Sequence, residues 1–91
     1  MEFKKEIDRI YLQNEGGQVI AEVQFPIGSD GLHNITHTVV DSSLHGQGMA
    51  GKLVKAAAEA IRAEGSKTHL TCSYAVKWFE KHPEYSDILA D

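Results

Sequence analysis

The fold of this chain is decided by residues 38–63, TVVDSSLHGQGMAGKLVKAAAEAIRA. The order of residue types predicts a strand, a glycine-rich loop and then a helix. Glycines at positions 46, 48 and 51 allow a tight turn and let a ligand approach the backbone without meeting a Cβ. The first N–H groups of the helix have no partner inside it, and they lie at the positive end of its dipole. We therefore expect this loop and helix start to cradle a phosphate.

Two common nucleotide-binding motifs do not fit the glycine loop. Its spacing matches the Gly-x-Gly-x-x-Gly fingerprint of dinucleotide-binding folds, but that fingerprint needs an acidic residue about twenty positions later. Thr71 and Cys72 occupy that place here. A P-loop needs Gly-Lys followed by Ser or Thr, whereas Leu53 follows Gly-Lys in this chain. The loop therefore belongs to neither class.

Composition limits the architecture and the partners. With 91 residues, 42% of them hydrophobic, the chain is long enough for one domain with its own core, and we expect that domain to span residues 1–91. The formal net charge is −4 and there is no basic stripe, which disfavours nucleic acid as a partner. The same charge permits a cationic acceptor such as an amine.

Cysteine usage and hydropathy indicate the compartment. The single cysteine, Cys72, excludes an intramolecular disulfide, and a lone thiol without a secretory signal predicts a reducing, cytoplasmic setting. No stretch approaches the roughly 18 apolar residues that a membrane helix needs. We therefore expect no membrane partner.

Periodicity places the other elements. An extended segment of mixed character before a turn at 15–17, and a cleanly alternating segment after it, predict a hairpin. A β-branched segment further on predicts a third strand. A fourth strand must run parallel to the third, because a helix connects them. Pro83 ends the helix that follows. The expected strands are 7–14, 18–25, 33–40 and 67–72, and the expected second helix is 74–82.

The same periodicities predict which side chains share a face. The second strand carries Val19, Ala21, Val23, Phe25 and Ile27 on one face, and the third carries Ile35, His37 and Val39. The long helix carries a core-facing stripe of Ala50, Leu53, Val54, Ala57 and Ile61, and the short helix turns Val76, Trp78 and Phe79 inward. Gly65 is the expected terminator of the long helix.

The glycine loop resembles the pyrophosphate-binding motif of the GNAT family of acyl-CoA-dependent N-acetyltransferases, Gln/Arg-x-x-Gly-x-Gly/Ala. The segment His45–Ala50 matches it at Gly48 and Ala50, and His45 stands where the family has Gln or Arg. Downstream, His69–Cys72, Tyr74 and Lys81–Tyr85 are similar to the small single-domain members of the family, so the resemblance covers Ile7 to Leu89.

This resemblance implies an α/β fold with a mixed α+β sheet, a minimal and truncated GNAT core. Its parts would be three antiparallel strands, a phosphate-loop helix, a parallel fourth strand that splays from the third, and a C-terminal helix. The first helices and last strands of the family are missing, so the acceptor site should be open, or completed by a partner or a second copy. The implied cofactor is acetyl-CoA or coenzyme A. Its expected contacts are Thr38, Val39, Val40, His45, Gly46, Gln47, Gly48, Met49, Ala50 and Gly51.

The candidate catalytic residues are Cys72, His37 and Tyr74. The thiol of Cys72 could accept the acetyl group before passing it on, or it could be a small packing residue. His37 could take a proton from an amine or from Cys72, and Tyr74 could protonate the departing thiolate. Lesser candidates are Tyr85 as the acid, and Glu22 and His69 as bases.

A metal site is not expected. Histidines at 33 and 37 on one strand would be about 13 Å apart at the strand rise of ~3.3 Å per residue. Two functions stay open: an N-acetyltransferase acting on a small amine or an exposed lysine, and a non-catalytic module or partner subunit that binds coenzyme A. The intact glycine loop argues against a purely structural domain.

Overall fold

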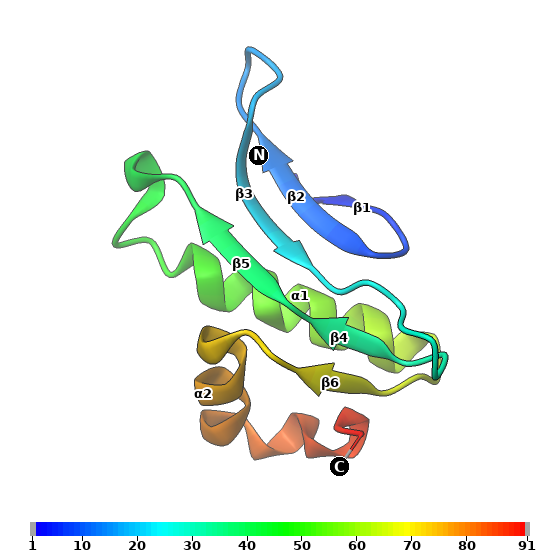
Figure 1. Ribbon diagram of the computed structural model, residues 1–91. Helices are drawn as coiled ribbons and strands as arrows, with labels where there is room; N and C mark the ends of the chain where they lie inside the picture. The colour runs from blue at the N-terminus through cyan, green and yellow to red at the C-terminus, as the bar shows by residue number, and fades with distance from the viewer. Residues whose placement is uncertain (1, 91) are drawn as a thin grey trace.

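The computed structural model of the chain describes residues 2–90, which form two sheets and two α-helices (Figure 1). In chain order the elements are β1 (Lys4–Lys5), β2 (Arg9–Gln13), β3 (Val19–Gln24), β4 (His33–Ile35), β5 (His37–Val40), the 3-10 helix η1 (Ser42–Leu44), α1 (Met49–Ala63), β6 (Thr68–Leu70), α2 (Ser73–Lys81) and the 3-10 helix η2 (Pro83–Ile88).

The strands form a four-stranded antiparallel sheet and a two-stranded parallel one. The first has the order β1-β2-β3-β5, and the second pairs β4 with β6. The expected antiparallel strands, the parallel strand after the long helix and the mixed α/β class are therefore confirmed. The short edge strand β1 and the two 3-10 helices were not predicted.

The segment predicted as one strand, 33–40, breaks at Thr36 into β4 and β5. His37 pairs opposite Gln24, and the N–H of Thr36 also donates to the Gln24 carbonyl at 3.0 Å. Two residues thus oppose one, which is the arrangement of a β-bulge and reverses the faces of the side chains that follow. Ile35 is fully buried whereas His37 and Val39 are exposed, so the prediction that these three share a face is wrong.

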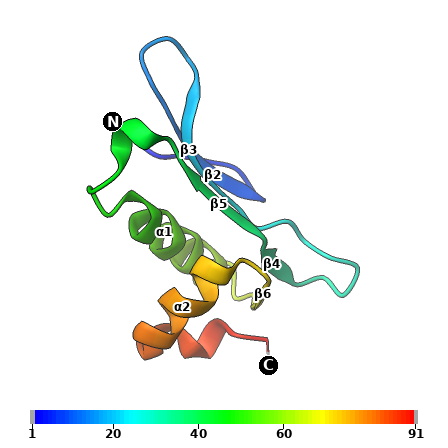
Figure 2. The ribbon, with the colours of Figure 1, turned by 60° about the vertical axis from the view of Figure 1, so that its left-hand side comes forward.

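Helix α1 covers one face of the four-stranded sheet and leaves the other face open (Figure 2). The predicted stripe is confirmed for four of its members, and Ala50 is half-buried. The fully buried residues of α1 are Leu53, Val54, Ala57, Ala58 and Ile61. They pack on Ile10, Leu12, Ala21, Val23, Phe25 and Ile35 of the sheets. This layer is the core of the domain.

Gly65 terminates helix α1, as predicted, two residues after its last helical residue, Ala63. The φ angle of Gly65 is +71°, which favours glycine. Its N–H donates to the Arg62 carbonyl, and the N–H of Ser66 donates to the Ile61 carbonyl. This pair of bonds is a Schellman motif, and it satisfies two of the carbonyls left free at the helix end.

Three predicted inward positions are wrong. Val19 and Ile27 lie at the ends of the regular alternation and are 46% and 45% exposed. Val76 is 38% exposed, because α2 turns Ala75, Trp78 and Phe79 toward the core instead. In the part of the chain that the structure describes, no helix has the length and apolar character to cross a membrane.

The last turn of the chain is tied to α1. Arg62 pairs with Asp87, and its guanidinium lies 4.5 Å from the centre of the Tyr85 ring. The Tyr85 hydroxyl donates to Glu59 at 3.1 Å. Burial, and then this bond to a carboxylate, raise the pKa of Tyr85. These contacts fix η2 against the helix that begins at the glycine loop.

A buried histidine joins β4 to the end of α1. His33 is 1% exposed, with Nδ1 2.7 Å from the Phe25 carbonyl and Nε2 3.0 Å from Glu64 Oε1. A carbonyl and an ionised carboxylate only accept hydrogen bonds, so the ring satisfies both partners when each of its nitrogens carries a proton. His33 is therefore a structural residue of the fold.

Replacing His33 with Ala should lower the free energy of unfolding by about 2–3 kcal/mol, because the change removes a buried ring and leaves the Phe25 carbonyl without its donor. Urea denaturation followed by Trp78 fluorescence measures this loss. The matched control is His69→Ala, which breaks an exposed pair with Asp30 and should change stability far less. Equal losses in the two variants would contradict the structural role of His33.

Candidate functional site

A pocket of about 370 Å³ opens where β5 ends and α1 begins. Its walls come from the last residues of β5, the loop, the first turn of α1 and the first turn of α2. The lining residues are Thr38, Val40, Leu44, His45, Gly46, Gly48, Met49, Ala50 and Tyr74. The glycine loop that organises the sequence is therefore one wall of this pocket.

The loop is held in place by Asp41. Its carboxylate accepts a hydrogen bond from the Ser43 hydroxyl at 2.6 Å and from the Ser43 N–H at 3.0 Å, which caps η1. These two bonds hold the pKa of Asp41 below its ordinary value. Gly46 and Gly48 then adopt φ angles of +83° and +67°, a region that side-chain-bearing residues rarely enter.

The N–H groups from Gly46 to Gly51 have no hydrogen-bond acceptor within residues 2–90, since the first helical bond is from the Lys52 N–H to the Gly48 carbonyl. No side chain caps the start of α1. A Cβ added at Gly46 or Gly48 would meet nothing within 4 Å, so the space in front of the loop is open. Free donors at the positive end of a 15-residue helix are an arrangement that favours an anion.

The second wall offers the main chain of β5. This strand has β3 on one side and no strand on the other among the described residues. The N–H of Asp41 donates to the Ile20 carbonyl of β3, so alternation along the antiparallel ladder turns the main-chain groups of Thr38 and Val40 away from β3. Both residues line the pocket. Their N–H and C=O groups are thus available to an extended ligand with amide bonds.

The predicted splay beside β5 is confirmed. Strand β4 pairs with β6 as far as Ile35, and the Ile35 carbonyl accepts from both Thr71 and Cys72. After the bulge, β5 pairs with β3 instead of β6. The ribbon shows β5 diverging from the end of β6, with α2 beginning beside the opening (Figure 1).

Tyr74, the candidate proton donor, is one of the residues that line the pocket. It lines the wall contributed by α2, and its hydroxyl has no hydrogen-bond partner within residues 2–90. A Cβ added at Gly51 would lie 3.3 Å from this hydroxyl, so the bare Cα of Gly51 allows α2 to pack close to the start of α1.

Cys72 reaches the pocket only through Thr38. Its thiol donates to the Thr38 hydroxyl at an Sγ–Oγ1 distance of 3.6 Å, and the residue is half-buried against the core. The sulfur is therefore close to the wall of the pocket without being one of its lining groups. This geometry is compatible with packing and with a role in the chemistry.

His37 is not brought to the pocket. The bulge turns its side chain to the open face of the sheet, whereas Thr38 and Cys72 lie on the side of α1. The expectation that His37 lies beside Cys72 is therefore not met, and the geometry gives it no route to the thiol.

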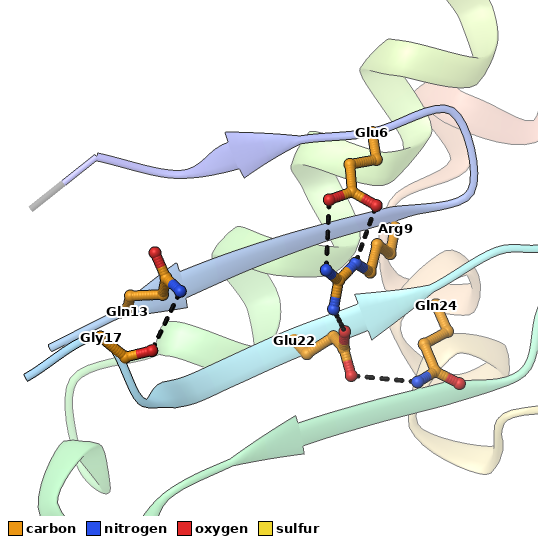
Figure 3. Close-up of polar contacts among 6 residues, drawn as sticks. All are labelled: Glu6, Arg9, Gln13, Gly17, Glu22 and Gln24. Atoms are coloured by element: carbon orange, nitrogen blue, oxygen red, sulfur yellow. Dashed lines mark hydrogen bonds and ion pairs between the residues drawn. The ribbon is translucent and has the colours of Figure 1, made fainter.

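Glu22, the other candidate base, also lies on the open face. It accepts from Arg9 at 2.8 Å and from Gln24 at 3.0 Å, and Arg9 is held in turn by Glu6 (Figure 3). These ion pairs hold the pKa of Glu6 below its ordinary value and raise that of Arg9. The Glu22 carboxylate is therefore already occupied by its neighbours.

The remaining candidates are also placed. Tyr85 belongs to η2, where Glu59 holds its hydroxyl, and His69 pairs with Asp30 at 2.8 Å. No group of three metal-binding side chains occurs among the described residues. Of the predicted cofactor contacts, Val39 lies on the open face, and Gln47 and Gly51 are not among the residues that line the pocket. Leu44, which also lines the pocket, was missed.

A mixed sheet that divides beside a glycine loop and an uncapped helix start is the architecture of a GNAT-type acyltransferase domain. The chain belongs to the GCN5-related N-acetyltransferase family, whose model matches residues 9–88. It is 38% identical over 50 residues to Protein NATD1 of Xenopus tropicalis, covering 55% of this chain and 46% of that protein. Protein NATD1 of Homo sapiens matches at the same identity over 44% of its length. The match thus spans less than half the length of these curated relatives.

Solved structures agree with the family assignment. A GCN5-like protein from Staphylococcus aureus superposes with a TM-score of 0.77 at 32% identity, over 97% of this chain and 86% of that one. The glucosamine-6-phosphate N-acetyltransferase of Arabidopsis thaliana gives a TM-score of 0.54 at 21% identity, over 86% of this chain and 57% of that one. At that identity the second likeness concerns the fold alone.

Replacing Asp41 with Ala should loosen the loop, because the cap of η1 is lost. Amide hydrogen exchange at residues 43–45, whose N–H groups bond to Asp41 and Ser42, should become faster when measured by NMR. The lowered pKa of Asp41 means that its contribution is complete above about pH 4 and is lost as the pH falls through the lowered value. Asp8→Ala, which removes a carboxylate outside the loop, is the control. Unchanged exchange in the Asp41 variant would contradict the capping role.

Proposed function

We propose that this domain is an acyl-CoA-dependent N-acetyltransferase that binds acetyl-CoA in the pocket between β5 and α1. One observation carries the proposal: the loop and helix start, whose N–H groups at Gly46, Gly48, Met49 and Ala50 are unpartnered, and the free main-chain edge at Thr38 and Val40 line a single pocket. The first set suits a pyrophosphate. The second suits the amide-containing pantetheine arm, which can add to the edge as a further strand would.

The proposed reaction is direct transfer. The acceptor nitrogen attacks the thioester carbonyl carbon, a C–N bond forms and the C–S bond breaks. The departing sulfur takes a proton from the Tyr74 hydroxyl, which is unpartnered in the pocket wall. The new amide nitrogen loses its proton to water, and the tyrosinate regains a proton from water. The chain's main contribution is to position the thioester and to polarise its carbonyl with main-chain N–H groups.

The acceptor in this proposal is a small amine or an exposed lysine. A net charge of −4 favours the approach of a cation. The free thiol of Cys72 supports a reducing, cytoplasmic setting. A second copy of the chain or another protein could complete the acceptor site, because the open face of the sheet beside β5 carries no covering helix among the described residues.

A second candidate function is a module that binds coenzyme A without catalysis. The observation that favours it is the chemistry of the pocket wall, whose lining residues include no carboxylate, while His37 and Glu22 lie on the opposite face. Incubation with acetyl-CoA and a panel of primary amines, with the released thiol measured, separates the two functions. Binding without amine-dependent thiol release would support the module and overturn the enzyme.

Replacing Gly48 with Val should abolish acetyl-CoA binding measured by calorimetry. A valine at φ +67° is strained, and its side chain would fill the open space in front of the free N–H groups. His45→Ala should weaken binding much less, because it removes only a side-chain contact.

The matched control for Gly48→Val is Gly17→Val. Gly17 lies in the turn between β2 and β3 with φ +84° and open space around it, so the substitution introduces the same kind of backbone strain far from the pocket. This variant should be destabilised and still bind acetyl-CoA. Full binding by Gly48→Val would put the pyrophosphate somewhere else.

The thiol of Cys72 distinguishes direct transfer from a covalent route. Under direct transfer, Cys72→Ala should lower stability by about 1 kcal/mol and leave both acetyl-CoA binding and amine acetylation intact. Denaturation, calorimetry and the thiol-release assay measure the three quantities. Intact-protein mass spectrometry without added amine provides the opposite test. An acetyl adduct at Cys72, together with loss of turnover in the variant, would replace direct transfer with a covalent intermediate.

A further inference from the structure

One buried titratable side chain takes part in the fold but not in the proposed reaction. His33 is 1% exposed and lies between Phe25, which follows β3, and Glu64, which caps the end of α1. Its Nδ1 is 2.7 Å from the Phe25 carbonyl, and its Nε2 is 3.0 Å from Glu64 Oε1. The Glu64 side chain is 39% exposed. A ring inside the core is thus joined to a carboxylate that reaches water.

The two acceptors determine what each protonation state of the ring does. As an imidazolium, the ring donates from both nitrogens and satisfies the carbonyl and the carboxylate together. As a neutral imidazole, it has one N–H, and its other nitrogen is an acceptor. The Phe25 carbonyl accepts no other hydrogen bond within residues 2–90, so the remaining proton belongs on Nδ1. Nε2 then faces the Glu64 carboxylate as a second acceptor, and that bond is lost.

The location of Glu64 gives a second reason for a charge on the ring. Glu64 is the C-cap residue of α1, where its N–H donates to the Ala60 carbonyl. A carboxylate at this place lies at the negative end of the helix dipole, whereas a cation there is stabilised. Arg62, in the last turn, is paired with Asp87. An imidazolium at His33 therefore compensates a carboxylate that is unfavourably placed.

Strand β6, on the other side of the ring, offers it no titratable partner among the described residues. Thr68 is the register partner of His33, and its hydroxyl donates to the His69 carbonyl. The His69 side chain alternates to the opposite face, where it bonds Asp30. Lys67 gives its carbonyl to the His33 N–H, and its side chain is exposed. Glu64 is thus the acidic partner on which the protonation of the ring depends.

We propose that the His33–Glu64 ion pair is a pH-dependent contact, formed while the ring is an imidazolium and broken once Nε2 has given its proton to water. Breaking it separates Glu64 from β4 and loosens the end of α1. The folded domain gains stability from the bound proton, so its stability is fully present at low pH and declines as the pH rises through the range in which histidines titrate. Neither residue lines the candidate acetyl-CoA pocket, so this inference does not depend on the proposed function.

Urea denaturation between about pH 5.5 and about pH 8.5 tests the ion pair. The unfolding constant of the wild type should rise roughly tenfold across this range, because a charge-assisted bond is lost with its proton. The pKa values of Asp30, Asp41 and Asp87 are lowered by their hydrogen bonds, so these carboxylates stay ionised throughout and do not contribute to the change.

The matched variant is Glu64→Gln. A glutamine amide donates an N–H to a neutral Nε2 while Nδ1 still donates to the Phe25 carbonyl, so the contact persists without the extra proton. The unfolding constant of this variant should change less than about twofold over the same range. The two pH profiles should therefore cross, with the wild type more stable at the acidic end and the variant more stable at the alkaline end. A substitution that only weakens the fold would give parallel profiles.

NMR of the ring nitrogens reads the protonation of His33 directly. In the wild type the Nδ1 proton should persist to the alkaline end of the range, whereas the Nε2 proton is lost as the pH rises. In Glu64→Gln, Nε2 should carry no proton at neutral pH. The control is His69→Ala, which removes an exposed histidine–carboxylate pair and should keep most of the wild-type pH dependence.

The outcomes decide for or against the ion pair. Crossing profiles, together with an Nε2 proton that leaves as the pH rises, support it. Parallel profiles of the wild type and Glu64→Gln would overturn it, and so would a His33 ring with a single proton over the whole range. If His69→Ala removes as much of the pH dependence as Glu64→Gln does, the assignment to His33 and Glu64 is overturned.

Discussion

The structure depends on a change of hydrogen-bond partner at Thr36. Up to Ile35 the chain pairs with β6, and from His37 onward it pairs with β3. Because one strand cannot stay beside both neighbours, the two sheets separate, and the edge of β5 that would have paired with β6 is left free. The same extra residue turns Thr38 toward α1 and His37 toward the open face. One irregularity thus determines where the pocket opens and which side chains line it.

The pocket combines two sources of main-chain donors with different geometry. The strand edge presents N–H and C=O groups along a line, whereas the start of α1 presents N–H groups that converge on one point. A ligand with an extended amide chain and a compact anionic group satisfies both. Gly51 adds a packing role to this, since its missing Cβ lets the aromatic side chains of α2 approach the helix start. The glycine-rich segment therefore sets the position of α2 as well as leaving N–H donors free.

Most of the fold could be predicted from the sequence, and the failures have identifiable causes. Local chemistry that the sequence shows directly determines the glycine loop and the helix after it. The same holds for the termination of that helix by Gly65. The break at Thr36 could not be seen, because residues 33–40 alternate without interruption and the bulge arises from pairing with Gln24, which is distant in sequence. This one omission placed His37 and Val39 on the wrong face. The prediction that Val76 faces inward was wrong, because tertiary contacts turn Ala75, Trp78 and Phe79 of α2 toward the core instead.

The strand edges differ in how well they are protected from pairing with another chain, and this difference bears on self-association. An unpaired strand edge is a template on which another extended chain can add. The outer edge at β1 is short and carries two lysines. The far edge at β6 is covered by Leu89 and Ala90, and the N–H of Ala90 donates to the Thr68 carbonyl. Strand β5 has neither protection. The edge that we propose to hold the pantetheine arm is thus also the edge most exposed to unwanted pairing, and a ligand bound there would shield it.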